Sequence, residues 1–161
     1  FIKSQPVFFS ILFETPPKVL GEKKMPLAIT LGFMERYIGL GFASEKDEND
    51  YDIMQNNIQV MLKAGATPLF TSDVPGIPAK EVIPMVTGVM KGQGIDNKTI
   101  LLSATREGAK ALGATNLGTL EQGKIADLIL VDGDPLKDIK ALERVQLVVK
   151  DGAVVVNHLK N

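Results

Sequence analysis

The sequence predicts an α/β fold followed by a small β unit, and three observations lead to this prediction. Apolar residues run almost without interruption from Val7 to Phe13, as in strands buried on both faces of a parallel sheet. Between Asp50 and Asp73, a helical pattern is followed by a glycine, a short strand and a polar residue at the strand's end. Near the C-terminus, Asp151-Gly152 separates two β-rich segments, which is a strong two-residue hairpin signal.

The composition is that of an ordinary globular protein. The 161 residues are 45% hydrophobic and 23% charged, and a net charge of -1 argues against a nucleic-acid groove or an anionic membrane surface as the main partner. The absence of cysteine excludes disulfides and thiolate metal sites. No apolar run is long enough to span a membrane.

The chain begins at Phe1, which is not a methionine, and it continues directly into strand-like residues. We therefore expect a fragment or a processed product, whose targeting signal would have been lost with the missing portion. We expect a cytoplasmic protein and leave a periplasmic or secreted location open.

In the first half, the strand at Val7 to Phe13 is expected to end at Pro16-Pro17. The segment from Gly21 to Ser44 is read as a loop with a short helix near Met34 to Ile38. The acidic cluster Glu45 to Asp50 is typical of a solvated loop rather than of a metal site. A helix then begins with Asp50 as its N-cap and ends before Gly65.

The second half alternates short elements. Thr67 to Thr71 forms the next expected strand, which ends at Ser72-Asp73. The expected helices are Ala79 to Met90, a short one from Asp96 or Asn97 to Leu102, and Arg106 to Leu112. The residues from about Ala114 to Asn157 predict a β unit with a strand at Asp127 to Val131, a turn at Asp132 to Pro135 and the hairpin at Asp151-Gly152.

Three stretches together resemble the amidohydrolase superfamily of metal-dependent hydrolases. The most specific is Leu117 to Leu136, which reads LGTLEQGKIADLILVDGDPL. The second is Ser103-Ala104-Thr105 with the alanine-rich helix that ends at Leu112-Gly113. The third runs from Ala64 to Asp73 and resembles the eighth barrel strand with its terminal aspartate. The order and spacing of the three stretches agree with those of the family over roughly residues 55 to 157. Within the family, the sequence of the motif is similar to that of the imidazolonepropionase and prolidase-like group.

The resemblance implies the C-terminal portion of a TIM-type (β/α)8 barrel plus part of a small flanking β-sandwich. On this basis residues 1–113 are expected to hold the last barrel strands and helices, with the seventh strand before residue 50. Residues 114–161 are expected to hold part of the composite β-sandwich domain. A complete barrel needs about 250 residues in the typical case.

Asp73 is the candidate catalytic and metal-binding residue. By resemblance it would coordinate a divalent metal, most simply zinc, and act as the general base for a bound water. The alternative from the local sequence is an N-cap or turn aspartate ahead of Val74-Pro75-Gly76. The family reads threonine where this chain has Ser72, which keeps a hydroxyl beside the carboxylate.

The remaining metal ligands are not found in this sequence. In the family they are histidines of the first, fifth and sixth strands, whereas this chain has one histidine, His158, in its C-terminal tail. We therefore expect the isolated chain to be inactive unless those strands come from another chain. The two hypotheses are a part of a metal-dependent hydrolase that cleaves amide or peptide-like carbon–nitrogen bonds, and an inactive structural or interaction remnant.

The partial barrel that the resemblance implies also predicts binding partners. A partial barrel leaves an open sheet edge and an apolar face, so pairing with the missing N-terminal part of the barrel or self-association is expected. The substrate is expected to be a small molecule, and the long segment from Gly21 to Asp50 is a candidate substrate-contacting loop. Asp132 and Asp134 are read as turn residues rather than calcium ligands, and the Gly-x-Gly at Gly92 follows a helix rather than a strand.

Overall fold

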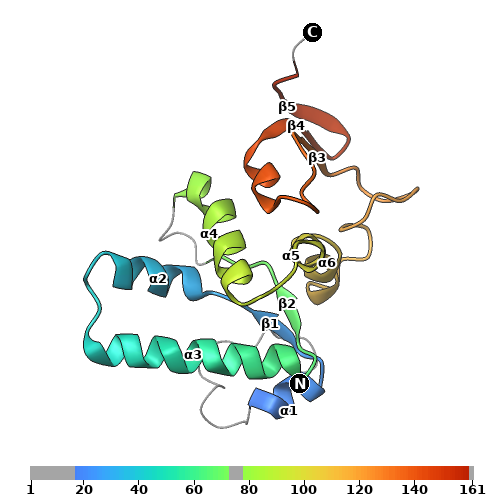
Figure 1. Ribbon diagram of the computed structural model, residues 1–161. Coiled ribbons are helices and arrows are strands. Elements are labelled where there is room, and N and C mark those ends of the chain that lie inside the picture. The colour runs from blue at the N-terminus through green and yellow to red at the C-terminus, as the bar shows by residue number, and fades with distance from the viewer. Residues whose placement is uncertain (1–16, 73–77, 160–161) are drawn as a thin grey trace. The chain divides into compact units, whose positions relative to one another are not determined.

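The computed structural model describes residues 17–72 and 78–159, and it divides into two compact units, Phe1–Ile95 and Asp96–Asn161 (Figure 1). The expected division into a barrel part, residues 1–113, and a β-sandwich part, residues 114–161, follows the domains of the family and stays a prediction. The expected strand at Val7 to Phe13 lies outside the described residues.

The first unit contains a parallel pair of strands joined through two helices (Figure 1). Strand β1 pairs with β2 in the register Pro26↔Thr67, Leu27↔Pro68 and Ala28↔Leu69. A parallel pair needs a crossover connection, which here is supplied by α2 and α3. The elements of this unit are α1 Pro17–Glu22, β1 Pro26–Ala28, α2 Leu31–Gly39, α3 Glu45–Lys63, β2 Thr67–Leu69 and α4 Ala79–Gly92.

The core of this unit lies beside the two strands. Most of its buried side chains are apolar, and the polar Thr87 and Gln93 are buried among them. The apolar ones include Leu20, Leu27, Ile29, Leu31, Ile58, Met61, Leu69, Val86, Val89 and Met90. Helix α1 approaches α3 closely at Gly21, where an added Cβ would lie 2.4 Å from the Met61 carbonyl oxygen. The strands and helices are therefore held by ordinary apolar packing, with glycine where two backbones meet.

Helix α3 begins earlier than the sequence predicted. Its N-cap is Ser44, not Asp50, and the Asp47 side chain completes a capping box by accepting a hydrogen bond from the Ser44 amide. The acidic cluster Glu45 to Asp50 is therefore helical, which corrects its reading as a loop. The reason is physical: carboxylates in the first turn interact favourably with the positive end of the helix dipole. The predicted end is confirmed, because Gly65 follows the helix with φ of +105°.

The prediction for Gly21 to Ser44, a loop with a short helix near Met34 to Ile38, is confirmed for the helix and wrong for most of the rest. This segment contains the end of α1, the whole of β1 and a helix, α2, that extends to Gly39 on one side and back to Leu31 on the other. The reason is that Leu27, Ile29 and Leu31 are buried. Tertiary packing of these side chains gives regular structure to a segment whose glycines and short apolar runs do not predict it. The candidate substrate-contacting loop at Gly21 to Asp50 is thus largely helix and strand.

The second unit opens with two short helices, α5 Asn97–Ser103 and α6 Arg106–Ala111, and both predictions are confirmed. Asp96 caps α5 by accepting hydrogen bonds from the amide and hydroxyl of Thr99. Those hydrogen bonds, the hydroxyl one first, lower the pKa of the Asp96 carboxyl. Gly113 follows α6 with φ of +71°.

A three-stranded antiparallel sheet with the order β3-β4-β5 completes this unit. Its elements are β3 Leu128–Val131, the 3-10 helix η2 Ile139–Glu143, β4 Val145–Lys150 and β5 Ala153–Asn157. The hairpin prediction is confirmed, with φ of +51° at Asp151 and +77° at Gly152. Helix η2 was not predicted from the sequence.

Asp127 fastens this hairpin to the segment that precedes β3. Its carboxylate accepts hydrogen bonds from the Lys150 ammonium and, at 2.7 Å, from the amide of Asp151. The Lys150 hydrogen bond is the main reason that the pKa of Asp127 is lowered, and the Asp151 amide adds to it. Asp127, which lies in the segment that resembles the family, therefore stabilises the hairpin in this chain.

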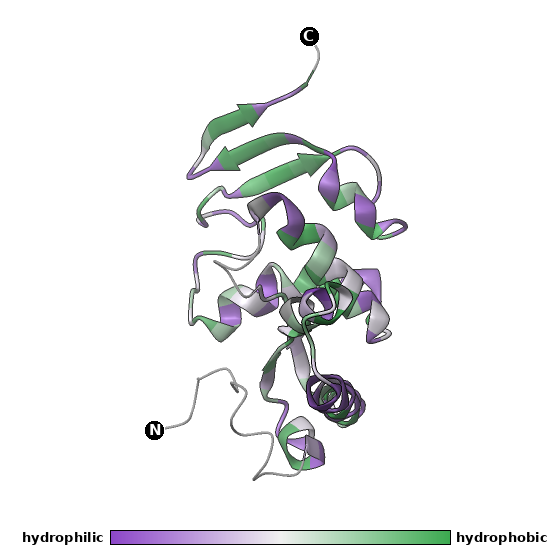
Figure 2. Ribbon diagram, turned by 90° about the vertical axis from the view of Figure 1, so that its left-hand side faces the viewer, coloured by the Kyte–Doolittle hydropathy of each residue, from purple (hydrophilic) through white to green (hydrophobic). Residues whose placement is uncertain are grey.

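The strands of this sheet are apolar yet incompletely covered. Figure 2 shows them in the hydrophobic colour, and no residue of β3, β4 or β5 is buried in the structure. Ile129, Leu130, Val154 and Val155 are each about half exposed, and successive residues of a strand point to opposite faces. Both outer strands of this sheet therefore expose apolar side chains.

Candidate functional site

The predicted catalytic residue, Asp73, lies outside the described residues, and its described neighbours are the residues that follow β2. Strand β2 ends at Leu69, and Phe70, Thr71 and Ser72 lead from it toward Asp73. The Thr71 hydroxyl donates a hydrogen bond of 3.2 Å to the carbonyl oxygen of Ile29, which directly follows β1. This bond joins the two strands just beyond their last paired residues.

The parallel pairing puts the carboxyl ends of β1 and β2 at one edge. In open α/β sheets and in barrels, ligands bind at this edge, because the loops that follow the strands converge there. Ser72, the last described residue of the segment that follows β2, is partly buried at this edge.

Two helices start from the same edge, since α2 follows β1 and α4 follows β2. They contact each other, and the Arg36 guanidinium of α2 forms an ion pair with the Glu81 carboxylate in the first turn of α4. The two side chains are 46% and 36% exposed, so the pair is open to solvent. A carboxylate in the first turn of a helix is favoured by the helix dipole, so the local sequence accounts for Glu81 without indicating Arg36 as its partner.

Helix α2 is fixed on two sides. The Tyr51 hydroxyl of α3 donates a hydrogen bond of 2.6 Å to Glu35, and partial burial, together with that bond, raises the pKa of Tyr51. On the α4 side, a Cβ at Gly32 would lie within 2.5 Å of the Met85 sulfur, so glycine permits a close approach there. These contacts hold the Arg36 position on a well-anchored element.

The other residues considered from the sequence are placed where they were expected. His158 is exposed in the C-terminal tail, where its amide bonds to the Gln146 carbonyl oxygen. Asp134 organises the predicted turn by accepting a hydrogen bond from the Leu136 amide. Within residues 17–72 and 78–159, no three histidine, cysteine, aspartate or glutamate side chains gather into a group that could hold a metal ion.

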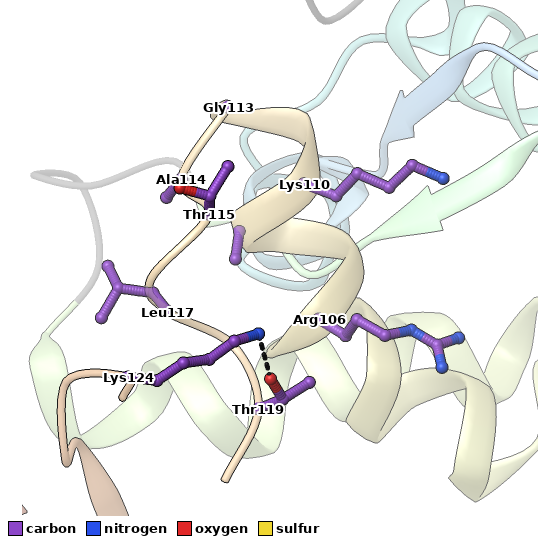
Figure 3. Close-up of a pocket in the computed structure, with 9 residues that line it drawn as sticks. Arg106, Lys110, Gly113, Ala114, Thr115, Leu117, Thr119 and Lys124 are labelled. Carbon is purple, nitrogen blue, oxygen red and sulfur yellow. Dashed lines mark hydrogen bonds between the residues drawn. The ribbon is translucent and has the colours of Figure 1, made fainter. Parts of the chain in front are cut away.

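A hollow of about 310 Å³ lies in the second unit, between α6 and the segment that follows it (Figure 3). Figure 3 shows the Lys124 ammonium pointing to the Thr119 hydroxyl, while Arg106 and Lys110 extend away from it. The cations therefore do not converge on one ligand, and the hollow is not a candidate catalytic site. It is lined by Arg106, Ala109, Lys110, Gly113, Ala114, Thr115, Leu117, Thr119 and Lys124.

Comparison with known proteins decides the family. The model of the amidohydrolase family matches residues 52–155, which include β2, the Asp73 position and the LGTLEQGKIADLILVDGDPL segment. The chain belongs to the amidohydrolase family. Among curated relatives of this amidohydrolase chain, the imidazolonepropionase of Shouchella clausii (strain KSM-K16) is 31% identical over 109 residues, which are 62% of this chain and 24% of that protein.

Solved structures support the same assignment. A Xaa-Pro dipeptidase with methionine bound in its active site is 28% identical, with a TM-score of 0.60 over 89% of this chain and 34% of that one. The A. niger ochratoxinase is 24% identical, with a TM-score of 0.73 over 88% of this chain and 34% of that one, and it shows the shared fold. The amidohydrolase chain thus spans about a quarter to a third of the length of these relatives.

The described part of this amidohydrolase chain is a mixed α/β structure consistent with part of the amidohydrolase fold. None of the described helices is both long and apolar enough to cross a membrane. The Arg36–Glu81 pair is the feature of this edge that sequence reasoning missed. The two residues are 45 positions apart, and no local signal indicates that they meet.

Proposed function

We propose that this chain supplies the last barrel strands and part of the β-sandwich of a metal-dependent hydrolase that acts on carbon–nitrogen bonds. The observation behind the proposal is that Asp73 lies within the matched family segment, and that the described residues before it, Phe70 to Ser72, follow β2 at the carboxyl edge of a parallel strand pair. Barrel enzymes put catalytic groups at this edge.

In this proposal, Asp73 is a ligand of a divalent metal, zinc in the simplest case. A bound metal lowers the pKa of a coordinated water and so supplies hydroxide near neutral pH. The Asp73 carboxylate accepts the water's proton and passes it to the leaving nitrogen, which is general acid–base catalysis. A carboxylate is a suitable ligand type, but one carboxylate does not make a site of three or four ligands.

The remaining ligands must lie beyond these 161 residues. The chain's one histidine, His158, is exposed in the tail after β5. The active site is therefore completed by a longer natural-length protein or by a second chain. The substrate is a small molecule with an amide or peptide-like bond, since the relatives include an imidazolonepropionase and a Xaa-Pro dipeptidase.

Metal removal tests this function. We expect the natural-length protein to hydrolyse a dipeptide or a related amide, to lose that activity on dialysis against a chelator and to regain it with zinc. The 161-residue chain alone, assayed in parallel, is expected to be inactive because it lacks the other ligands. Hydrolysis that survives complete metal removal would contradict metal dependence.

The second candidate is an inactive structural or interaction remnant, and the single histidine favours it. The same assay separates the two candidates. A natural-length protein that binds no metal and hydrolyses no carbon–nitrogen substrate, even when zinc is supplied, supports the remnant and overturns the hydrolase.

Either candidate needs a covering partner for the sheet of the second unit. The outer strand β5 has the sequence Ala153-Val154-Val155-Val156-Asn157, with no charge or proline to prevent edge pairing. Val154 and Val155 are 59% and 58% exposed, and Val155 lies where the register between β4 and β5 shifts. We propose that the missing part of the barrel protein covers this sheet, and that copies of the chain associate where that part is absent.

We expect the 161-residue chain alone to self-associate at micromolar concentration, as seen by sedimentation velocity. A Val155→Lys substitution is expected to shift the distribution toward monomer, since it puts a charge on the exposed apolar strand. Lys46→Gln, on the exposed N-terminal half of α3, is the control and should change nothing. A strictly monomeric wild-type chain at high concentration would contradict the proposal.

A further inference from the structure

The dipeptide Asp-Gly occurs twice in this chain, at Asp132-Gly133 and at Asp151-Gly152, and all four residues are exposed. An aspartate followed by glycine can be modified by a reaction of the chain with itself. The glycine amide nitrogen attacks the aspartate carboxyl carbon and closes a five-membered ring. Glycine favours this step because it has no Cβ to crowd the nitrogen. Since the two dipeptides are the same, their surroundings in the fold decide which of them reacts.

At the hairpin between β4 and β5, the glycine nitrogen is already hydrogen-bonded. The Gly152 amide donates a hydrogen bond of 3.0 Å to the carbonyl oxygen of Ala126. The Asp151 amide donates one of 2.7 Å to the Asp127 carboxylate. Both bonds hold the dipeptide against the segment before β3. The Gly152 nitrogen can attack only after its own bond has broken.

In the turn after β3, the two reacting groups are not held. Within residues 17–72 and 78–159, neither the Gly133 amide nor the Asp132 carboxylate has a hydrogen-bonding partner. The main-chain carbonyl oxygen of Asp132 does have one, because Nε of Arg144 donates to it at 3.0 Å. A hydrogen bond from a charged donor is stronger than a neutral one. It withdraws electrons from the Asp132–Gly133 peptide and so makes the Gly133 N–H more acidic.

We infer that Asp132-Gly133 is a site of spontaneous isoaspartate formation in the folded protein, and that the hairpin protects Asp151-Gly152 from the same reaction. A bond forms between the Gly133 nitrogen and Cγ of Asp132, and one Cγ–O bond breaks. The departing oxygen leaves as water, with the amide proton and one proton from solvent. Water then opens the ring at either carbonyl carbon and gives aspartate or isoaspartate. The reaction needs only water, so the inference is independent of the proposed hydrolase function.

The product changes the turn after β3. In isoaspartate the main chain runs through Cβ and Cγ, so one methylene group is added between Asp132 and Gly133. The former main-chain carbonyl of Asp132 becomes a carboxylate, and the Arg144 guanidinium already binds an oxygen of this group. Arg144 is therefore placed to form an ion pair with the product. We expect the modified turn to persist once it has formed.

Peptide mapping of the folded natural-length protein, incubated near neutral pH and labelled with an isoaspartate-specific methyltransferase, tests this inference. The peptide with Asp132 should gain label on the order of 10-fold faster than the peptide with Asp151, about the effect of one hydrogen bond that must first break. In the protein unfolded by guanidinium chloride, both peptides should gain label at similar rates. Asp132→Glu should abolish the label on the first peptide, because glutamate would have to close a six-membered ring.

Asp127→Ala tests the protection of the hairpin. It removes the acceptor of the Asp151 amide, so Asp151 should gain label faster than in the wild type while the rate at Asp132 stays the same. The inference is overturned if Asp132 gains no label in the folded protein, or if Asp151 gains it equally fast. It is also overturned if the ratio of the two rates is unchanged by unfolding, or if Asp127→Ala leaves Asp151 as protected as before.

Discussion

Replacing Asp73 by asparagine in the natural-length protein is expected to lower kcat by roughly 10²- to 10⁴-fold, the range for loss of a general acid or base. Asparagine keeps the size and the polar surface of the side chain, so folding should be little affected. It cannot take the proton of a bound water, and it is a weaker metal ligand than a carboxylate. Steady-state hydrolysis rates at saturating zinc, compared with the wild type, measure the effect.

Ser72→Ala is the matched control for this substitution. Ser72 is the residue before Asp73 and is partly buried at the same edge, and the chain has no histidine placed to activate it as a nucleophile. We expect this variant to retain activity within a few-fold of wild type. If Asp73→Asn and Ser72→Ala have equal rates, Asp73 is a turn residue, which is the alternative that the local sequence leaves open.

Gly118→Ala is expected to destabilise the second unit by about 2–5 kcal/mol, which combines a left-handed backbone with overpacking. Gly118 has φ of +85°, and an added Cβ would lie 2.7 Å from the Ala109 Cβ and 2.9 Å from the Thr105 carbonyl oxygen. The Thr105 carbonyl oxygen is a backbone atom, and it cannot move away without unwinding the start of α6. Amide hydrogen exchange of α6, converted to an opening free energy, measures the loss.

Gly123→Ala separates the two contributions. Gly123 has nearly the same backbone angle, φ of +86°, but an added Cβ there would meet nothing within 4 Å. This variant should therefore cost only the backbone term, about 1–2 kcal/mol. Equal losses for the two variants would show that the contact between Gly118 and α6 is not a tight one. The glycine of Leu117-Gly118 in the family-like segment thus has a packing explanation.

The sequence was most informative where local signals were strong. Asp96 before α5, Gly65 after α3 and Asp151-Gly152 between β4 and β5 each mark a boundary through their own side-chain or backbone chemistry. The apolar pattern predicts β2, and the apolar pattern together with Pro78 before the helix predicts α4. The structure contains both elements. These elements need no knowledge of the tertiary contacts.

Prediction was poor where packing or distant contacts decide the structure. The acidic run after Ser44 was read as a loop, because a capping box with aspartate at its third position is a weaker signal than one with glutamate or glutamine. Strand β1 has only three residues and takes its order from pairing with β2, 41 positions away along the chain at Pro26↔Thr67. Arg36 and Glu81 meet only because α2 and α4 start from the same edge.

The metal content of the natural-length protein tests the central claim most directly. Zinc should be measured by mass spectrometry under native conditions in the wild type and in Asp73→Asn, prepared identically. We expect bound metal in the wild type and a clear loss of metal in Asp73→Asn, because a ligand has been removed. Equal metal content in the two proteins, or none in either, would contradict the assignment of Asp73 as a metal ligand.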